Sequence, residues 1–162
     1  MQWIPNYPFR LDHPSDGPHY TRSMKLHQEV LEVPTRGRGF TDLSSRVEGV
    51  VAASGVKTGL CTVFVQHTSA SLVIQENADP SVQRDLERWI ARVAPEDPKA
   101  YEHDAEGLDD MPAHLRSAMT RTSEVVPVTK GQLGLGTWQA IYLWEHRSSP
   151  HRRRVIVHVQ GV

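Results

Sequence analysis

The segment 101–110 carries the densest group of side chains able to do chemistry, because two imidazoles lie near several carboxylates. His103 and Asp104 lie inside the segment, Asp110 closes it, and His114 follows four residues later. Imidazoles and carboxylates together can bind a divalent metal or act as general acids and bases. The spacing matches no standard zinc motif, so a solvated acidic loop remains the alternative interpretation.

A third histidine, His67, lies where an apolar, β-branched run (60–66) ends and a turn with Thr68 and Ser69 begins. A strand end holds a reactive side chain on a rigid support, so this position suits a functional residue. The alternative is a purely structural turn, held by hydrogen bonds between its side chains and the backbone.

Further polar residues lie at two other strand boundaries. Glu76 and Asn77 come between an expected strand and a helix start, where free backbone N–H groups favour an anion, while Asp79 is expected to cap the helix. Trp138 and Gln139 follow two glycines that let a backbone approach another group closely. Trp138 is otherwise an ordinary core or interface aromatic residue.

An arginine-rich stretch at 151–154, together with Arg147, could bind phosphate. It also fits a solvated hairpin tip. The sequence contains no Walker loop, no dinucleotide-binding fingerprint and no Gly-x-Ser-x-Gly elbow. The common nucleotide-binding and serine-hydrolase motifs are therefore excluded as the source of function.

Composition narrows the class of protein further. The 162 residues carry a formal net charge of -1, which gives no reason to expect a nucleic-acid or anionic-membrane partner. The single cysteine, Cys61, lies in an apolar run and is expected to be a small buried residue that forms no internal disulfide. Because we find neither a signal-peptide pattern nor a bilayer-length apolar run, we expect a cytoplasmic protein.

The apolar pattern predicts how these residues are supported. Residues 1–22 contain four prolines and no apolar periodicity, so we interpret them as an extended N-terminal arm before a single domain at 23–162. Three helices are expected between Thr41 and Gly55, between Asp79 and Pro95, and after Asp109 or Asp110. About six strands are expected, at 25–33, 60–66, 72–74, 124–129, 137–145 and 154–160.

The order of these elements favours an α+β fold. Runs of neighbouring strands predict a mostly antiparallel β-sandwich with about three helices packed on one side. Tight turns join the last three strands, which predicts a meander. The late strand at 137–145 is apolar on both faces, through Trp138, Ile141, Tyr142 and Trp144, so each face needs a cover.

Five segments together resemble the YjbQ family, which is often labelled secondary thiamine-phosphate synthase. They are 66–72, 76–80, 101–104, 109–114 and 131–139, and the resemblance extends over about residues 22–161. It implies a homotrimer in which the matched polar segments meet in a pocket near the subunit boundary. The turn at 148–150 departs from the family pattern: it lacks the usual glycine and contains Pro150, which has no backbone N–H, so a phosphate-binding role there is in doubt.

These observations lead to one functional hypothesis, a metal-dependent enzyme that acts on a phosphorylated small molecule. His67, His103 and His114 are expected to bind one divalent cation, zinc or magnesium. Three imidazoles suit zinc, whereas magnesium would prefer the oxygens of Glu76, Asp104 and Asp110. The expected acid–base or supporting carboxylates are Glu76, Asp104 and Asp110, and the expected substrate-binding residues are Ser69, Asn77, Trp138 and Gln139. The alternative is a non-catalytic, trimeric metal- or metabolite-binding protein with the same pocket.

Overall fold

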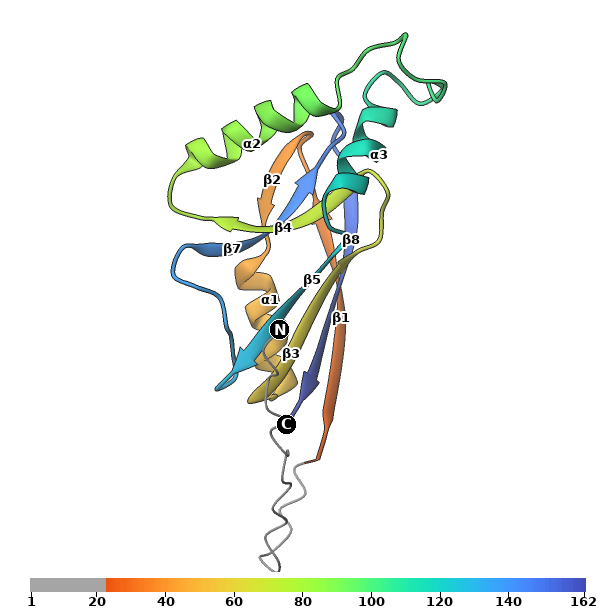
Figure 1. Cartoon of the computed structure of the whole chain (residues 1–162). Coiled ribbons are helices and arrows are strands. Elements are labelled where there is room, and N and C mark those ends of the chain that lie inside the picture. Colours follow the sequence, from red (N-terminus) through yellow and green to blue (C-terminus); the bar gives the residue numbers. More distant parts are fainter. Residues whose placement is uncertain (1–22) are drawn as a thin grey trace, which may run out of the picture.

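The computed structural model describes residues 23–162, and the expected arm at 1–22 lies outside the described residues. The described residues form two antiparallel sheets and three helices, arranged as in Figure 1. The strands are β1 (Lys25–Pro34), β2 (Gly39–Asp42), β3 (Thr58–Val65), β4 (Ala70–Glu76), β5 (Ser123–Thr129), β6 (Gln132–Leu133), β7 (Gln139–Glu145) and β8 (Arg152–Gly161). The helices are α1 (Ser44–Ser54), α2 (Pro80–Val93) and α3 (Asp110–Met119). The predicted α+β fold with antiparallel sheets is confirmed.

The sheets pair strands that are distant in the sequence. The larger sheet has the order β1-β8-β3-β5-β6, and the smaller one has the order β2-β7-β4. The predicted meander of β5, β7 and β8 is therefore wrong, because β7 pairs with β2 and β4 while β5 and β8 lie on either side of β3. Tight turns predict short connections, but they do not determine which strand becomes the neighbour.

One hydrophobic core fills the space between the two sheets. Alternate residues of β3 and β8 point inward, and their small β-branched side chains are almost completely buried. Helix α1 lies against this core with Val47, Val50 and Val51, and it ends at Gly55, whose φ of 65° suits glycine. Cys61 is buried as expected, and desolvation raises the pKa of its thiol to about 11.

Both faces of β7 are covered within a single chain. Ile141 and Leu143 face the core, while Trp144 stacks on Phe40 and its indole N–H donates to Glu87 of α2. The relative exposure of Ile141, Tyr142 and Trp144 is 5% or less, so these residues do not need a partner subunit. Of the four apolar residues expected to need a cover, Trp138 alone is exposed, at 65%, because it precedes the strand.

The outer face of the larger sheet carries several exposed apolar side chains beside polar ones such as Gln28 and His158, and nothing among the described residues covers it. Its exposed apolar side chains are Leu26, Val30, Leu60, Phe64 and Val125. The strand register aligns Leu26 and Leu60 across Gln160, and Val30 and Phe64 across Ile156, so the side chains form regular rows. Leu60 and Phe64 of β3 therefore stay exposed in one chain, because nothing among the described residues covers this side.

Helix boundaries follow the expected caps to different degrees. Helix α2 begins as predicted, with Pro80 in its first turn and the Asp79 carboxylate accepting the N–H of Ser81 at 2.8 Å. Helix α1 begins at Ser44 rather than after Thr41, because residues 39–42 form a strand paired with β7. No helix within residues 23–162 is long and apolar enough to cross a membrane.

Candidate metal centre

Two of the predicted metal ligands meet at the start of α3, beside a carboxylate. Asp110 is the first residue of this helix, and His114 lies four residues later on the same face. His103 reaches the same place from the loop between α2 and α3. One potential ligand atom from each of the three residues lies within 4.8 Å of the others, so the three side chains could hold a single cation.

Asp110 is the buried centre of the cluster. Its Oδ2 lies 2.7 Å from Nε2 of His103 and 3.5 Å from Nε2 of His114. Its Oδ1 accepts a hydrogen bond from the guanidinium of Arg147. The side chain of Asp110 is only 3% exposed, so its orientation is fixed from both sides.

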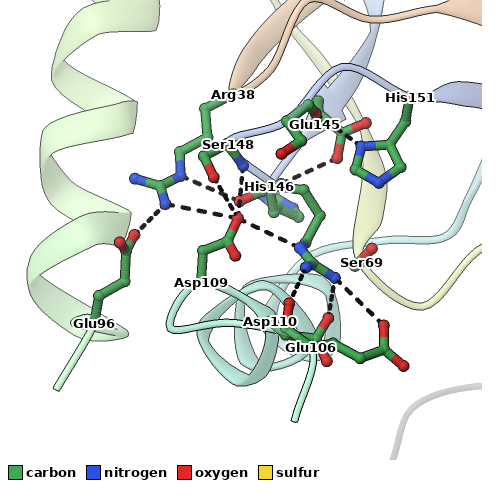
Figure 2. A network of polar contacts seen from close by, with 12 residues as sticks. Arg38, Ser69, Glu96, Glu106, Asp109, Asp110, Glu145, His146, Ser148 and His151 are labelled. Carbon is green, nitrogen blue, oxygen red and sulfur yellow. Dashed lines mark hydrogen bonds and ion pairs between the residues drawn. The ribbon is translucent and has the colours of Figure 1, made fainter. Parts of the chain in front are cut away.

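Arg147 connects Asp110 to a wider acidic group. Its Nε lies 3.3 Å from Oδ2 of Asp109, and its Nη1 lies 3.8 Å from the carboxylate of Glu106. Figure 2 shows Asp109 beside Ser148, with Asp110 and Glu106 further along the same network. Arg147 faces these three carboxylates, and a second guanidinium, that of Arg38, lies 4.0 Å from Asp109, so the group keeps an excess of negative charge that favours a cation.

Asp109 is held as an anion at the base of this group. Desolvation by itself would raise its pKa, but hydrogen bonds from the backbone N–H and hydroxyl of Ser148, at 2.7 and 2.8 Å, together with Arg147, lower it to about 2. The N-cap of α3 therefore differs from the one expected. Asp109 occupies the N-cap position but makes no capping hydrogen bond to its own helix.

His67 lies beside the cluster, on the turn between β3 and β4. Its Nδ1 contacts the N–H and the hydroxyl of Ser69, at 3.1 and 3.0 Å, and it is not one of the three clustered residues. His67 and His114 both line a shallow cavity of about 300 Å³. Burial and the nearby charge of Arg153 lower the pKa of His67, so its neutral form is favoured.

A buried ion pair lies next to this turn and contacts Ser69. Arg153 donates from Nε and Nη2 to the two carboxylate oxygens of Glu145, at 2.7 and 2.6 Å, and both side chains are almost fully buried. The same Nη2 donates to the hydroxyl of Ser69 at 3.2 Å. Ser69 is therefore held beneath the cavity and does not face it as an open substrate-binding group.

The remaining predicted residues form a second group elsewhere. Glu76, Trp138 and Gln139 line a separate cavity of about 360 Å³, and the Asn77 N–H donates to the Trp138 carbonyl at 3.1 Å. This group lies at the far end of the ladder between β4 and β7, because Glu76 pairs with Gln139 whereas Ala70 pairs with Glu145. Six residues along a strand correspond to roughly 20 Å, so one chain does not unite the two groups.

Asp104 also lies apart from the cluster. It is exposed, and its carbonyl accepts the Gly107 N–H at 3.3 Å within a turn. The sequence interpretation missed the role of Arg147, which was considered for phosphate but faces carboxylates here. It also missed the backbone carbonyl of Thr68, which accepts a hydrogen bond from Nδ1 of His114 at 3.0 Å. Backbone groups leave no signal in side-chain patterns.

Comparisons with known proteins agree with this fold. A family model described as UPF0047 protein YjbQ-like matches residues 29–162. A UPF0047 protein of Synechocystis is 59% identical over 139 residues, 86% of this chain and 95% of the relative. YjbQ of Escherichia coli O157:H7 is 44% identical over 136 residues, 83% of this chain and 98% of the relative.

Solved structures show the same fold. The crystal structure of a YbjQ-like protein of unknown function from Sulfolobus solfataricus has a TM-score of 0.79 at 28% identity, covering 86% of this chain and 100% of that one. A conserved hypothetical protein from Thermus thermophilus has a TM-score of 0.71 at 37% identity, covering 79% of this chain and 97% of that one.

Proposed function

The chain belongs to the YjbQ-like UPF0047 family, and from that premise we propose a divalent-metal-dependent enzyme that acts on a phosphorylated small molecule. The metal is held by His103, Asp110 and His114. The observation that carries the proposal is the convergence of their ligand atoms within 4.8 Å around a buried carboxylate. A second feature supports it: the Thr68 carbonyl accepts from Nδ1 of His114, as backbone carbonyls commonly do for metal-binding histidines.

The donor set favours zinc over magnesium. Two imidazoles and one carboxylate are typical of catalytic zinc sites, whereas magnesium prefers oxygen ligands. Three protein ligands leave one zinc position open for a water or a substrate oxygen. When bound, such a metal supplies a Lewis acid that polarises a phosphoryl oxygen or lowers the pKa of a bound water.

The protein residues around the ligands have separate tasks. Arg147 fixes Asp110 through Oδ1 and leaves Oδ2 facing the two imidazoles. The cavity beside His67 and His114 gives a substrate access to the cluster. The excess of carboxylates around Arg147 balances part of the charge of a bound cation.

Substrate recognition at Glu76, Asn77, Trp138 and Gln139 requires a second subunit in this proposal. These residues lie roughly 20 Å from the cluster within one chain, as estimated from strand spacing. The high exposure of Trp138 and the exposed apolar side chains on the outer face of the larger sheet support an assembly such as the homotrimer that the resemblance implies. In that assembly a neighbouring copy brings the second group toward the metal.

We place this enzyme in the cytoplasm, with a diffusible substrate and without a nucleic-acid or membrane partner. The near-neutral formal charge of -1 supports this, because it provides no strong field for a polyanion. Thiamine-phosphate synthesis is not the main reaction we expect. The backbone N–H of Ser148 is used on Asp109, so this part of the turn does not offer a free donor to phosphate.

One observation favours the alternative of a non-catalytic binding protein, in its metal-free, metabolite-binding form. Asp110 already has partners on both oxygens, so the cluster is satisfied as a hydrogen-bonded network. Turnover separates the two functions, because a binding protein leaves no product. The proposed enzyme, loaded with zinc, releases phosphate or pyrophosphate from a pool of phosphorylated metabolites, and His114→Ala abolishes this release.

Metal content tests the ligand assignment directly. Elemental analysis of chelator-free wild-type protein is expected to give about one zinc per subunit. His103→Ala and His114→Ala are expected to lose most of it. His27→Ala is the matched control, because His27 also pairs with a carboxylate, Glu29 at 2.9 Å, but lies on β1 outside the cluster. Metal-free wild type, or full occupancy in both cluster variants, would show that the assignment is wrong.

A further inference from the structure

One peptide group, between Thr68 and Ser69, contacts two histidines of the candidate site. Its carbonyl oxygen, on Thr68, lies 3.0 Å from Nδ1 of His114. Its N–H, on Ser69, points to Nδ1 of His67 at 3.1 Å. In both histidines Nδ1 therefore takes part in a hydrogen bond. Its partner is an acceptor in His114 and a donor in His67.

The contact with His114 fixes one tautomer. A carbonyl oxygen has only lone pairs, so it can only accept a hydrogen bond. Nδ1 of His114 must therefore carry the proton, and the lone pair of the neutral ring lies on Nε2. That atom faces Oδ2 of Asp110 at 3.5 Å, so His114 presents a metal-binding nitrogen to the cluster.

The contact with His67 fixes the opposite tautomer. A backbone N–H can only donate, so Nδ1 of His67 must be the acceptor, and the proton of the neutral ring lies on Nε2. The hydroxyl of Ser69, 3.0 Å from the same Nδ1, strengthens this assignment. Because Arg153 donates to that hydroxyl oxygen at 3.2 Å, the hydroxyl proton is free to point at His67.

A nitrogen whose proton is fixed by a backbone N–H on the other ring nitrogen has no lone pair for a metal. This applies to His67, whereas no hydrogen bond among the described residues fixes Nδ1 of His103, so that ring can exchange its Asp110 hydrogen bond for a metal bond. Nε2 of His67 has no hydrogen-bond partner within residues 23–162, and the ring lines the cavity next to His114. His67 and His114 thus differ in the protonation state of Nε2. One presents a lone pair, and the other presents an N–H.

We propose that His67 is a neutral hydrogen-bond donor that binds an oxygen of the substrate through Nε2–H, beside the metal, and is not a third metal ligand. This inference rests on the proposed function for the presence of a metal and an oxyanion. A phosphoryl oxygen is the matching ligand, since it accepts from a donor while it contacts a cation. The lowered pKa of His67 fits this role, because a neutral ring remains a donor over the physiological range.

The tautomers can be measured without knowledge of the substrate. Long-range ¹H–¹⁵N correlation spectra of ¹⁵N-labelled full-length protein at neutral pH distinguish protonated from unprotonated ring nitrogens. We expect protonated Nε2 in His67 and protonated Nδ1 in His114, and we expect the His67 signals to keep this pattern after zinc is added. A proton on Nδ1 of His67, or loss of its Nε2 proton on zinc binding, would overturn the proposal.

Substitutions test the donor role, with inorganic phosphate as the probe. Zinc content should stay unchanged in His67→Ala and His67→Gln, which separates this residue from His103 and His114. Phosphate affinity of the zinc-loaded protein should fall roughly tenfold in His67→Ala, as expected for a lost hydrogen bond to a charged group, and should recover in part in His67→Gln, whose amide restores a donor.

The possible outcomes separate the donor role from the proposed function. Loss of zinc in His67→Ala, with thermal unfolding unchanged, makes His67 a ligand and contradicts the donor role. Equal phosphate affinity in wild type and His67→Ala contradicts it as well. If the wild-type protein binds no metal, the proposed function is contradicted instead. The NMR spectra still determine the tautomer of His67 in that case.

Discussion

Two neighbouring carboxylates, Asp109 and Asp110, differ in their tasks because different groups reach them. Asp109 accepts two hydrogen bonds from Ser148 and one from Arg147, which ties the start of α3 to the turn after β7. Asp110 shares Arg147 but faces two imidazoles with its other oxygen. The first carboxylate therefore holds two segments together, and the second is the one that we propose as a ligand of the cation.

His146 predicts a loss of stability in mild acid. Its ring is buried against Ser71, and desolvation, aided by the charge of Arg116, lowers its pKa to about 3. The unfolded chain has an ordinary histidine pKa of about 6.5, so between these values it binds a proton that the folded state does not. The contribution of His146 therefore falls by about 2 kcal/mol from pH 7.5 to pH 5.

Urea unfolding of wild type and His146→Gln at several pH values checks this prediction. Glutamine keeps a polar contact for Ser71 but does not titrate, so the variant should show a smaller loss between pH 7.5 and pH 5. Other titrating groups are common to both proteins and cancel in the difference. Equal pH dependence in the two proteins would mean that His146 does not stay neutral in the folded state.

The sequence identifies the residues of the cluster better than their partners. His103, Asp110 and His114 are visible as candidates because their side chains carry the necessary chemistry. Arg147 lies 37 positions after Asp110, and the Thr68 carbonyl lies 46 positions before His114, so only the folded chain brings them together. The separation of Glu76 and Trp138 from the cluster depends on strand pairing in the same way.

At the scale of the elements, local signals are reliable and long-range pairing is not. Asp79 and Pro80 determine the start of α2, and Gly55 determines the end of α1, because caps act within one turn of the chain. The position of β7 between β2 and β4 depends on contacts across the whole chain. Apolar alternation predicts a strand but not its neighbour.

The close approach of β3 and β8 gives a prediction about glycine. A Cβ atom at Gly59 would lie 2.0 Å from the carbonyl oxygen of Gln160 and 2.7 Å from Cα of Gly161. Gly59→Ala must push the two strands apart and should destabilise the fold by about 1–3 kcal/mol, as overpacking does. Chemical denaturation at neutral pH measures the change.

Gly49→Ala is the matched control for this substitution. Gly49 lies within α1, is exposed, and has no heavy atom within 4 Å of an added Cβ. Alanine is the better helix former, so this variant should gain about 0.5–1 kcal/mol. A Gly59→Ala protein as stable as wild type would show that β3 and β8 do not approach this closely.

At the scale of the whole molecule, the outer face of the larger sheet predicts self-association. Leu60 and Phe64 are each 41% exposed in a single chain, in rows with Leu26 and Val30. Rows of exposed apolar side chains of this kind are expected to pack against other subunits, and the family resemblance implies three. Light scattering at micromolar concentration should therefore give the mass of a trimer.

Charge substitutions on that face test where the subunits meet. The double variant Leu60→Lys/Phe64→Lys should shift the protein toward a monomer, because burying two ammonium groups is costly. Val93→Lys is the control, since Val93 is 46% exposed on α2, away from this sheet. A monomer mass for the wild type, or an intact trimer in the double variant, contradicts this assignment of the interface.

The central claim concerns one cation at His103, Asp110 and His114. Anomalous diffraction above and below the zinc edge, on crystals of the full chain grown with zinc, locates the ion directly. We predict one peak per subunit within bonding distance of Nε2 of both histidines and a carboxylate oxygen of Asp110, with Nε2 of His67 outside the coordination sphere. An empty cluster, or an ion coordinated elsewhere in the chain, would contradict the claim.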